Sequence, residues 1–233
     1  MIKPLILLFA PFVLNLALSM ATAFTVPWEL WARDPSRASL VFFSRMYTWQ
    51  SPAMMVIQVV FGLAAYSQLK SREELYSFED LKPLWRTLLI VAGLTAFSFV
   101  LFTAEGAFYV YMYYGGNWTE YSSSWAAMVK EVPLWARLLN ALAAPFTAGV
   151  FEEVLWRGYG ITVLEKRFST RKAVFIQAVA FGLWHVSPIH VVVTAIIGFM
   201  YGFLFVKRRR LLILMVTHIV TDLLGFSGFL FSP

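Results

Sequence analysis

The sequence predicts an all-α, polytopic transmembrane helix bundle, and three observations carry this prediction. Hydrophobic residues make up 60% of the 233 residues and charged residues only 14%, whereas soluble domains carry about a quarter charged residues. Apolar stretches close to the roughly 20 residues that a helix needs to cross a bilayer recur along the chain. Lysines and arginines gather in short runs between these stretches, as they do in membrane proteins.

Seven apolar segments are each expected to form one spanning helix. They cover about residues 4–24, 53–69, 84–104, 136–164, 172–187, 190–206 and 211–230. The first resembles a cleaved signal peptide, because Lys3 precedes it and Ala21-Thr22-Ala23 ends it, but its length favours a retained helix. No repeat or change of composition divides the chain, so we expect a single membrane domain over residues 1–233.

The basic residues predict the orientation of these helices. With seven spans, three basic loops fall on one side, which is expected to be cytoplasmic, with the N-terminus inside and the C-terminus outside. Their basic residues are Lys70, Arg72, Lys82 and Arg86, then Lys166, Arg167, Arg171 and Lys172, then Lys207, Arg208, Arg209 and Arg210. Arg33, Arg37 and Arg45 lie on the other side and oppose this orientation. The formal charge of +6 therefore indicates topology and contact with anionic lipid, and no nucleic-acid partner is expected.

The connections carry few chemical signals. Residues 105–134 are rich in tyrosine and tryptophan, which is typical of a membrane interface. We expect an interfacial belt or a re-entrant loop there, with a lid over a site as an alternative. His190, close to Pro188 in a short turn, is likewise expected at the interface rather than as a ligand.

Three of the expected helices carry ionisable side chains deep in the membrane. These are Glu152, Glu153 and Arg157 on the fourth, His185 on the fifth, and His218 and Asp222 on the seventh. A charge at that depth costs a few kcal/mol, so such residues usually face an internal site. At about 1.5 Å per residue from the basic loops, Glu153, His185 and Asp222 all lie roughly 18–20 Å deep. The matched depth predicts one shared centre.

The glutamates divide into a paired and an unpaired carboxylate. Glu153 and Arg157 are spaced i, i+4, which favours a salt bridge. Glu152, about 100° around the helix, is left without this partner. We expect Glu152 to take a proton from water while the other two hold the site. The alternative is a structural ion-pair cluster that locks helices together.

The histidines suit the same chemistry. His185 follows Phe181 by one helical turn and is expected to share in activating water or to bind a metal. Otherwise it is a core histidine bonded to a backbone carbonyl. His218 and Asp222 share one helix face, so the imidazole is expected to stabilise an oxyanion and the aspartate to orient it or to ligate a metal. The alternative is a polar pair that joins helices.

Three motifs in this order resemble the CPBP family, which comprises CAAX-processing endopeptidases and bacteriocin-processing (Abi) proteins. They stand as Glu152-Glu153-Val154-Leu155-Trp156-Arg157, Phe181 to His185, and His218 to Asp222. Gly198 and Gly202 also fit the family pattern and would allow close helix packing. The likeness covers about residues 143–225, which we expect to form the catalytic core.

The resemblance implies an intramembrane endopeptidase that cleaves a membrane-associated or lipid-anchored substrate. Water would be activated by Glu152 and His185, and His218 with Asp222 would face the oxyanion. An ionised aspartate cannot donate a hydrogen bond, so Asp222 is more suited to orienting His218 or to holding a metal. Zinc stays an alternative, because relatives are described as metalloproteases. Its candidate ligands are Glu152, His185, His218 and Asp222.

Other classes fit less well. Thiol catalysis is excluded by the absence of cysteine, and no His-Glu-x-x-His motif is present. Asp222 is the only aspartate in an expected span, and no histidine follows the rhomboid-like Gly225-Phe226-Ser227-Gly228. A proton-coupled transporter or a non-catalytic immunity or scaffold protein remains as an alternative. We expect a multi-pass protein of a prokaryotic cell membrane or a eukaryotic ER membrane, with a membrane-protein segment or a prenylated peptide as partner.

Overall fold

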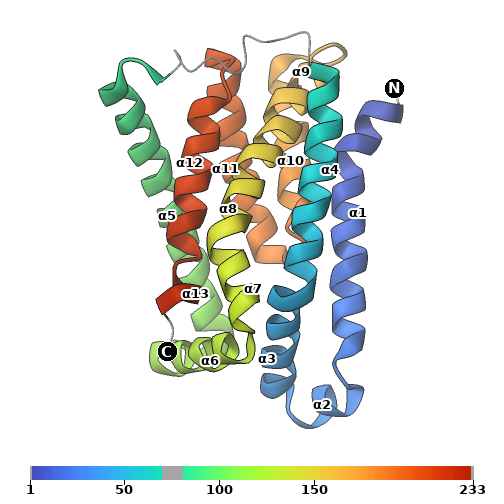
Figure 1. Cartoon of the computed structure of the whole chain (residues 1–233), viewed down its shortest axis with the longest axis vertical. Coiled ribbons are helices and arrows are strands. Elements are labelled where there is room, and N and C mark those ends of the chain that lie inside the picture. The colour runs from blue at the N-terminus through green and yellow to red at the C-terminus, as the bar shows by residue number, and fades with distance from the viewer. Residues whose placement is uncertain (1, 70–80, 232–233) are drawn as a thin grey trace.

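The computed structural model describes residues 2–69 and 81–231, and this part of the chain is a bundle of helices without strands (Figure 1). The labels α and η denote α-helices and π-helices. The first half comprises α1 (Ile2–Thr25), α2 (Trp28–Arg33), α3 (Pro35–Arg45), η1 (Met46–Gln50), α4 (Ser51–Leu69), α5 (Leu84–Tyr114) and α6 (Trp118–Glu131). The second half comprises α7 (Leu134–Leu138), η4 (Leu139–Ala143), α8 (Ala144–Thr147), η5 (Ala148–Ile161), α9 (Thr162–Leu164), α10 (Thr170–Trp184), α11 (Pro188–Arg208), α12 (Leu212–Gly225) and α13 (Gly228–Phe231).

Within the described residues, six helical stretches are long and apolar enough to cross a membrane. They are Leu5–Thr25, Pro35–Leu69, Leu84–Tyr114, Leu134–Leu164, Pro188–Arg208 and Leu212–Phe231. The fifth predicted span, 172–187, corresponds to α10, whose 15 residues rise only about 22 Å. It packs inside the bundle against α1, α11 and η5. The prediction of a polytopic helix bundle is confirmed, although only six helices have full spanning length.

The second predicted span was drawn too short. The helix runs unbroken from Pro35 to Leu69 through α3, η1 and α4, whereas the sequence predicted only 53–69. Residues 35–52 were not included because their charged side chains, Arg37 and Arg45, are typical of a loop between membrane helices. In the structure Arg37 forms an exposed ion pair with Glu131, and Arg45 donates to a backbone carbonyl at the end of α1. These turns therefore lie at the polar end of the bundle.

The connection predicted as an interfacial belt or re-entrant loop is helical. Within residues 105–134, α5 continues to a turn at Gly115 and Gly116, both with positive φ, which glycine adopts without strain. Asn117 then caps the N-terminus of α6, because its side chain accepts a hydrogen bond from the backbone N–H of Glu120. Helix α6 lies across the lower end of the bundle in Figure 1 and packs there against α3.

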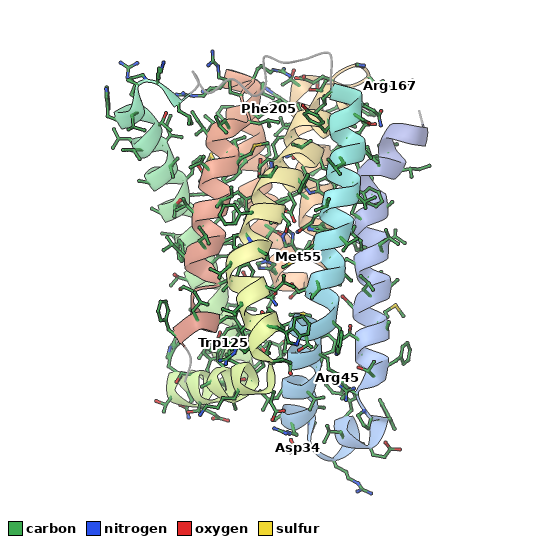
Figure 2. The ribbon with its side chains drawn as sticks, viewed as in Figure 1. Asp34, Arg45, Met55, Trp125, Arg167 and Phe205 are labelled. Atoms are coloured by element: carbon green, nitrogen blue, oxygen red, sulfur yellow. The ribbon has the colours of Figure 1, made fainter. Side chains whose placement is uncertain are left out.

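The described basic loops lie at one end of the bundle, as predicted. In Figure 1 the N-terminus, α9, the end of α11 and the start of α5 and α12 lie at one end, and the C-terminus lies at the other. Figure 2 shows Arg167 at the first end and Arg45 and Asp34 at the opposite end. Lys70 and Arg72 lie outside the described residues. The basic loops that the structure describes therefore share an end with the N-terminus.

Close helix packing surrounds α10 and α11. A Cβ atom on Gly198 would lie 2.9 Å from a ring carbon of Phe181, and one on Gly202 would lie 2.8 Å from the Gln177 amide nitrogen. These glycines let α11 approach α10, as the small-residue spacing predicted. The close approach fixes α10, which carries part of the site.

At the centre of the bundle lies η5, which packs against α4, α10 and α12. All of its residues except Val150 and Phe151 are buried. A Cβ atom on Gly149 would lie 2.5 Å from the Ile219 side chain, so η5 and α12 touch directly. The sequence predicted an ordinary helix here, whereas π-helices have i→i+5 hydrogen bonds and are frequent at functional sites.

Candidate active site

Glu153 is the hub of a buried polar cluster. Its Oε1 accepts hydrogen bonds from Arg157 Nη1 and from His218 Nδ1, both at 2.9 Å. The guanidinium lies over the rings of Phe181 at 4.1 Å and Tyr201 at 5.2 Å. Glu153 and Arg157 are both fully buried, so their charges compensate each other, and the aromatic faces additionally stabilise the guanidinium. The predicted pairing of Glu153 with Arg157 is confirmed; the bond to His218 was not foreseen.

Glu152 is also buried, with only 3% of its surface exposed. Its Oε1 accepts from Gln58 Nε2 at 2.7 Å and from Trp184 Nε1 at 2.8 Å. Its Oε2 has no hydrogen-bond partner among the described residues and lies 3.9 Å from His218 Nε2. The sequence predicted that Glu152 lacks an arginine partner; in the structure its Oε1 accepts two N–H hydrogen bonds, and its Oε2 has no partner among the described residues.

His218 joins the two glutamates to the aspartate of its own helix. Its Nδ1 is bonded to Glu153, which leaves Nε2 directed between Asp222 Oδ2 at 3.6 Å and Glu152 Oε2 at 3.9 Å. Both separations are too long for direct hydrogen bonds, but one water molecule can bridge such gaps. Residues from η5 and α12 therefore meet around a single imidazole, as the matched depths of Glu153 and Asp222 predicted.

His185 ends α10 and is oriented by its neighbours. Its Nδ1 lies 3.0 Å from the Phe181 carbonyl oxygen, and the Phe181 ring packs edge-on to the imidazole at 5.0 Å. The predicted aromatic packing is thus present, together with the backbone bond that was the alternative. The contacts of His185 run to Phe181 and His190, and no direct bond joins it to a glutamate in the described part of the chain.

The turn that carries His185 is held in an unusual conformation. Val186 has φ 64°, which a β-branched residue rarely adopts. On the other side, Asn15 Nδ2 of α1 donates to the Trp184 carbonyl at 2.6 Å and its Oδ1 accepts from Gln50. Backbone strain of this kind persists where the surroundings enforce it and often marks functional sites.

A second carboxylate–imidazole pair lies next to His185. His190 Nδ1 is 2.9 Å from a carboxylate oxygen of Glu105, its ring stacks on Phe102 at 5.7 Å, and it meets the His185 ring at 5.0 Å. The expectation that His190 is only an interfacial residue was therefore incomplete. Glu105 was missed because the predicted span ended one residue earlier, at residue 104.

The candidate metal ligands do not form a metal shell. Across the described residues, no group of three or more His, Asp or Glu side chains is arranged to hold a metal ion. Oε1 of Glu152 is occupied by N–H donors, and Nδ1 of His218 by Glu153. His185 turns its Nδ1 to a carbonyl, and Asp222 lies 3.6 Å from His218. This arrangement is a carboxylate–imidazole cluster joined by the hydrogen bond between Glu153 and His218.

The fold and the site define a multi-pass helical membrane protein with a buried centre of carboxylates and histidines. Residues 133–224 match the family model described as type II CAAX prenyl endopeptidase Rce1-like, which confirms the resemblance to the CPBP family drawn from the three motifs. The matched segment indicates a membrane endopeptidase. It contains all six predicted site residues, whereas Gln58 and Glu105 lie outside it. No curated protein and no solved structure matches the chain significantly.

Proposed function

We propose that this protein is an intramembrane endopeptidase in which Glu152 activates a water molecule to attack a peptide bond. The observation that carries the proposal is the open Oε2 of Glu152, which is buried and faces His218 Nε2 at 3.9 Å. A buried carboxylate oxygen without a partner is costly. It is explained if a water molecule, or the reacting amide, occupies that space during turnover.

In the proposed reaction water attacks the amide directly, without an acyl-enzyme. Oε2 of Glu152 takes a proton from water as the water oxygen forms a bond to the carbonyl carbon of the amide. The tetrahedral intermediate then collapses: the C–N bond breaks, and the proton on Glu152 passes to the leaving nitrogen. The products are a new carboxyl terminus and a new amine, so one water molecule is consumed for each bond cleaved.

His218 is suited to stabilise the tetrahedral oxygen. Its Nδ1 donates to Glu153, so Nε2 can donate to an oxyanion only when the ring is a doubly protonated imidazolium. Glu153, Asp222 and Glu152 all approach the ring within 4 Å, and their negative charge attracts a cation there. With Arg157, an imidazolium leaves the cluster with three negative and two positive groups. In this proposal Asp222 orients His218 and does not itself donate.

His185 assists from the neighbouring turn. With its Nδ1 donating to the Phe181 carbonyl, Nε2 is left as the acceptor of the neutral ring. Trp184 directly precedes His185 and donates a hydrogen bond to Glu152. The same turn therefore places both Trp184 and His185 beside the site. Distances between catalytic groups often shorten only when the substrate is bound, and we propose that His185 approaches the water in that complex.

The proposed substrate is a membrane-protein segment or a prenylated peptide. The site lies inside the helix bundle, on a segment buried among apolar side chains, and the matched family model describes prenyl endopeptidases. A lipid-anchored peptide reaches such a site from the bilayer. A free soluble peptide would have to leave water first.

Cleavage by purified full-length protein in nanodiscs tests the proposal. Two probes are offered, a fluorogenic farnesylated peptide ending in a CAAX sequence and an unprenylated transmembrane peptide. We expect Glu152→Gln to remain folded and to lose cleavage of whichever probe the native protein accepts. Unchanged cleavage by Glu152→Gln would remove the proposed base.

The Glu105–His190 pair favours one second candidate, a proton-coupled transporter, because it extends the ionisable groups beyond the proposed reaction centre. Proton flux into liposomes, measured with a pH-sensitive dye, separates the two. Flux without any peptide cleavage would support transport, and cleavage without flux would support the endopeptidase. A folded protein that shows neither activity would fit the immunity or scaffold alternative.

A further inference from the structure

Two N–H donors from different helices converge on the same oxygen of Glu152. Gln58 on α4 donates to Oε1 at 2.7 Å and Trp184 on α10 donates to it at 2.8 Å. We propose that Gln58, together with Trp184, is a positioning residue that makes Oε2 the reactive oxygen of Glu152. This inference rests on the proposed function and adds a residue from the half of the chain that the family model does not match.

The two bonds determine which oxygen can accept a proton. A carboxylate oxygen offers two lone pairs, and two N–H donors occupy both positions on Oε1. Bonds from N–H groups to an ionised acceptor are among the stronger hydrogen bonds in proteins. Rotation of the carboxylate plane out of this position would break both bonds, so one oxygen is held by the donors and the other, Oε2, stays directed at His218, 3.9 Å away.

Gln58 is itself held in the orientation that donation requires. Thr147 Oγ1 lies 2.9 Å from Gln58 Oε1, so the amide oxygen faces the hydroxyl and the amide nitrogen faces the carboxylate. Thr147 immediately precedes η5, the element that carries Glu152. A glutamine on an apolar membrane helix is costly unless its amide is bonded. Both ends of this amide are bonded, and both bonds serve the site.

The free space beside this contact is small. A cavity of about 10 Å³ is lined by Gln58, Glu152 and Trp184 among apolar neighbours, which is close to the smallest volume that holds one water. A shortened side chain at position 58 would enlarge it and admit water that could replace the lost donor. Methionine keeps the length of glutamine and removes the N–H group, so Gln58→Met is the appropriate substitution.

The test compares kcat and KM of full-length variants in nanodiscs with whichever probe the native protein cleaves. We expect Gln58→Met and Trp184→Phe each to lower kcat by roughly 10- to 100-fold, the effect of one hydrogen bond to a charged group, while KM changes by less than about threefold. Gln68→Met places the same substitution at an exposed position of α4 and should leave both constants unchanged. Melting temperatures verify that each variant is folded.

The outcomes separate this inference from the proposed function. If Glu152→Gln is inactive but folded Gln58→Met keeps native kcat, the positioning role is wrong and the endopeptidase proposal stands. If Gln58→Met raises KM alone, Gln58 contacts substrate and the inference is also overturned. If Gln58→Met does not fold, Trp184→Phe decides in the same way, since it keeps the aromatic packing. If Glu152→Gln is active, the proposed function itself fails.

Discussion

Removing the Arg157 guanidinium should leave the fully buried Glu153 carboxylate without its cationic partner. In Arg157→Met the side chain fills similar apolar space between Phe181 and Tyr201, but Glu153 loses the donor at 2.9 Å. Breaking a buried ion pair from one side costs about 3–5 kcal/mol. His218 still bonds to Glu153 in the variant, and this bond does not offset the loss because it exists in the native protein too. We therefore expect a loss of about 3–5 kcal/mol in unfolding free energy.

The double variant Glu153→Met/Arg157→Met distinguishes a stranded charge from lost packing. Removing both charges should recover at least half of the stability lost in Arg157→Met, because apolar residues of similar volume replace buried ion pairs at little cost. Arg37→Met breaks the exposed pair with Glu131 and should cost about 0–1 kcal/mol. Unfolding is followed by steric trapping in bicelles.

Two results would refute this reasoning. One is an Arg157→Met variant as stable as the Arg37→Met control, which would mean that Glu153 is compensated without Arg157. The other is a double variant no more stable than Arg157→Met, which would assign the loss to packing. Cleavage by the double variant should in either case be lost, since His218 then has no carboxylate on Nδ1.

Three further predictions follow from the site and its supports. His218→Gln should stay folded and lose roughly 100- to 1,000-fold in kcat, the effect of removing an oxyanion donor; near-native turnover would exclude that role. Val186→Gly should raise unfolding free energy by about 1 kcal/mol, because glycine adopts the φ of 64° without strain; an unchanged melting temperature would argue against strain. Gly198→Ala should cost about 1–3 kcal/mol, since its Cβ would lie 2.9 Å from Phe181. Gly93→Ala meets nothing within 4 Å and should not destabilise, so equal melting of the two would contradict the packing argument.

Much of the fold could be predicted because membrane helices follow local rules. Length, apolar content and the placement of basic residues sufficed to assign the bundle and the arrangement of its ends. The boundaries failed where local composition was misleading. Arg37 and Arg45 made a helix look like a loop, and Glu105 fell just beyond a span drawn from hydropathy. Nothing local in η5 indicated a π-helix, since hydrogen-bond register depends on how α4 and α12 pack around it.

The site could be predicted in part, where its contacts follow from local helix geometry. Glu153 and Arg157 are neighbours on one helix, so their pairing follows from spacing alone. The matched depth of Glu153 and Asp222 predicted that their two helices would meet at one polar centre. Gln58 could not be assigned from sequence, because it lies 94 residues from Glu152 and only tertiary packing brings them together. A glutamine in an otherwise apolar membrane helix is nevertheless a sequence signal for a polar partner inside the bundle.

The central claim, that Glu152 activates water and does not attack the substrate itself, is tested most directly by isotope labelling. A single turnover of the accepted probe is run in water enriched in oxygen-18, and the new carboxyl terminus and Glu152 are analysed by mass spectrometry. The account predicts one labelled oxygen in the product and none in Glu152. Label in the Glu152 carboxylate would reveal a covalent acyl intermediate and contradict the account.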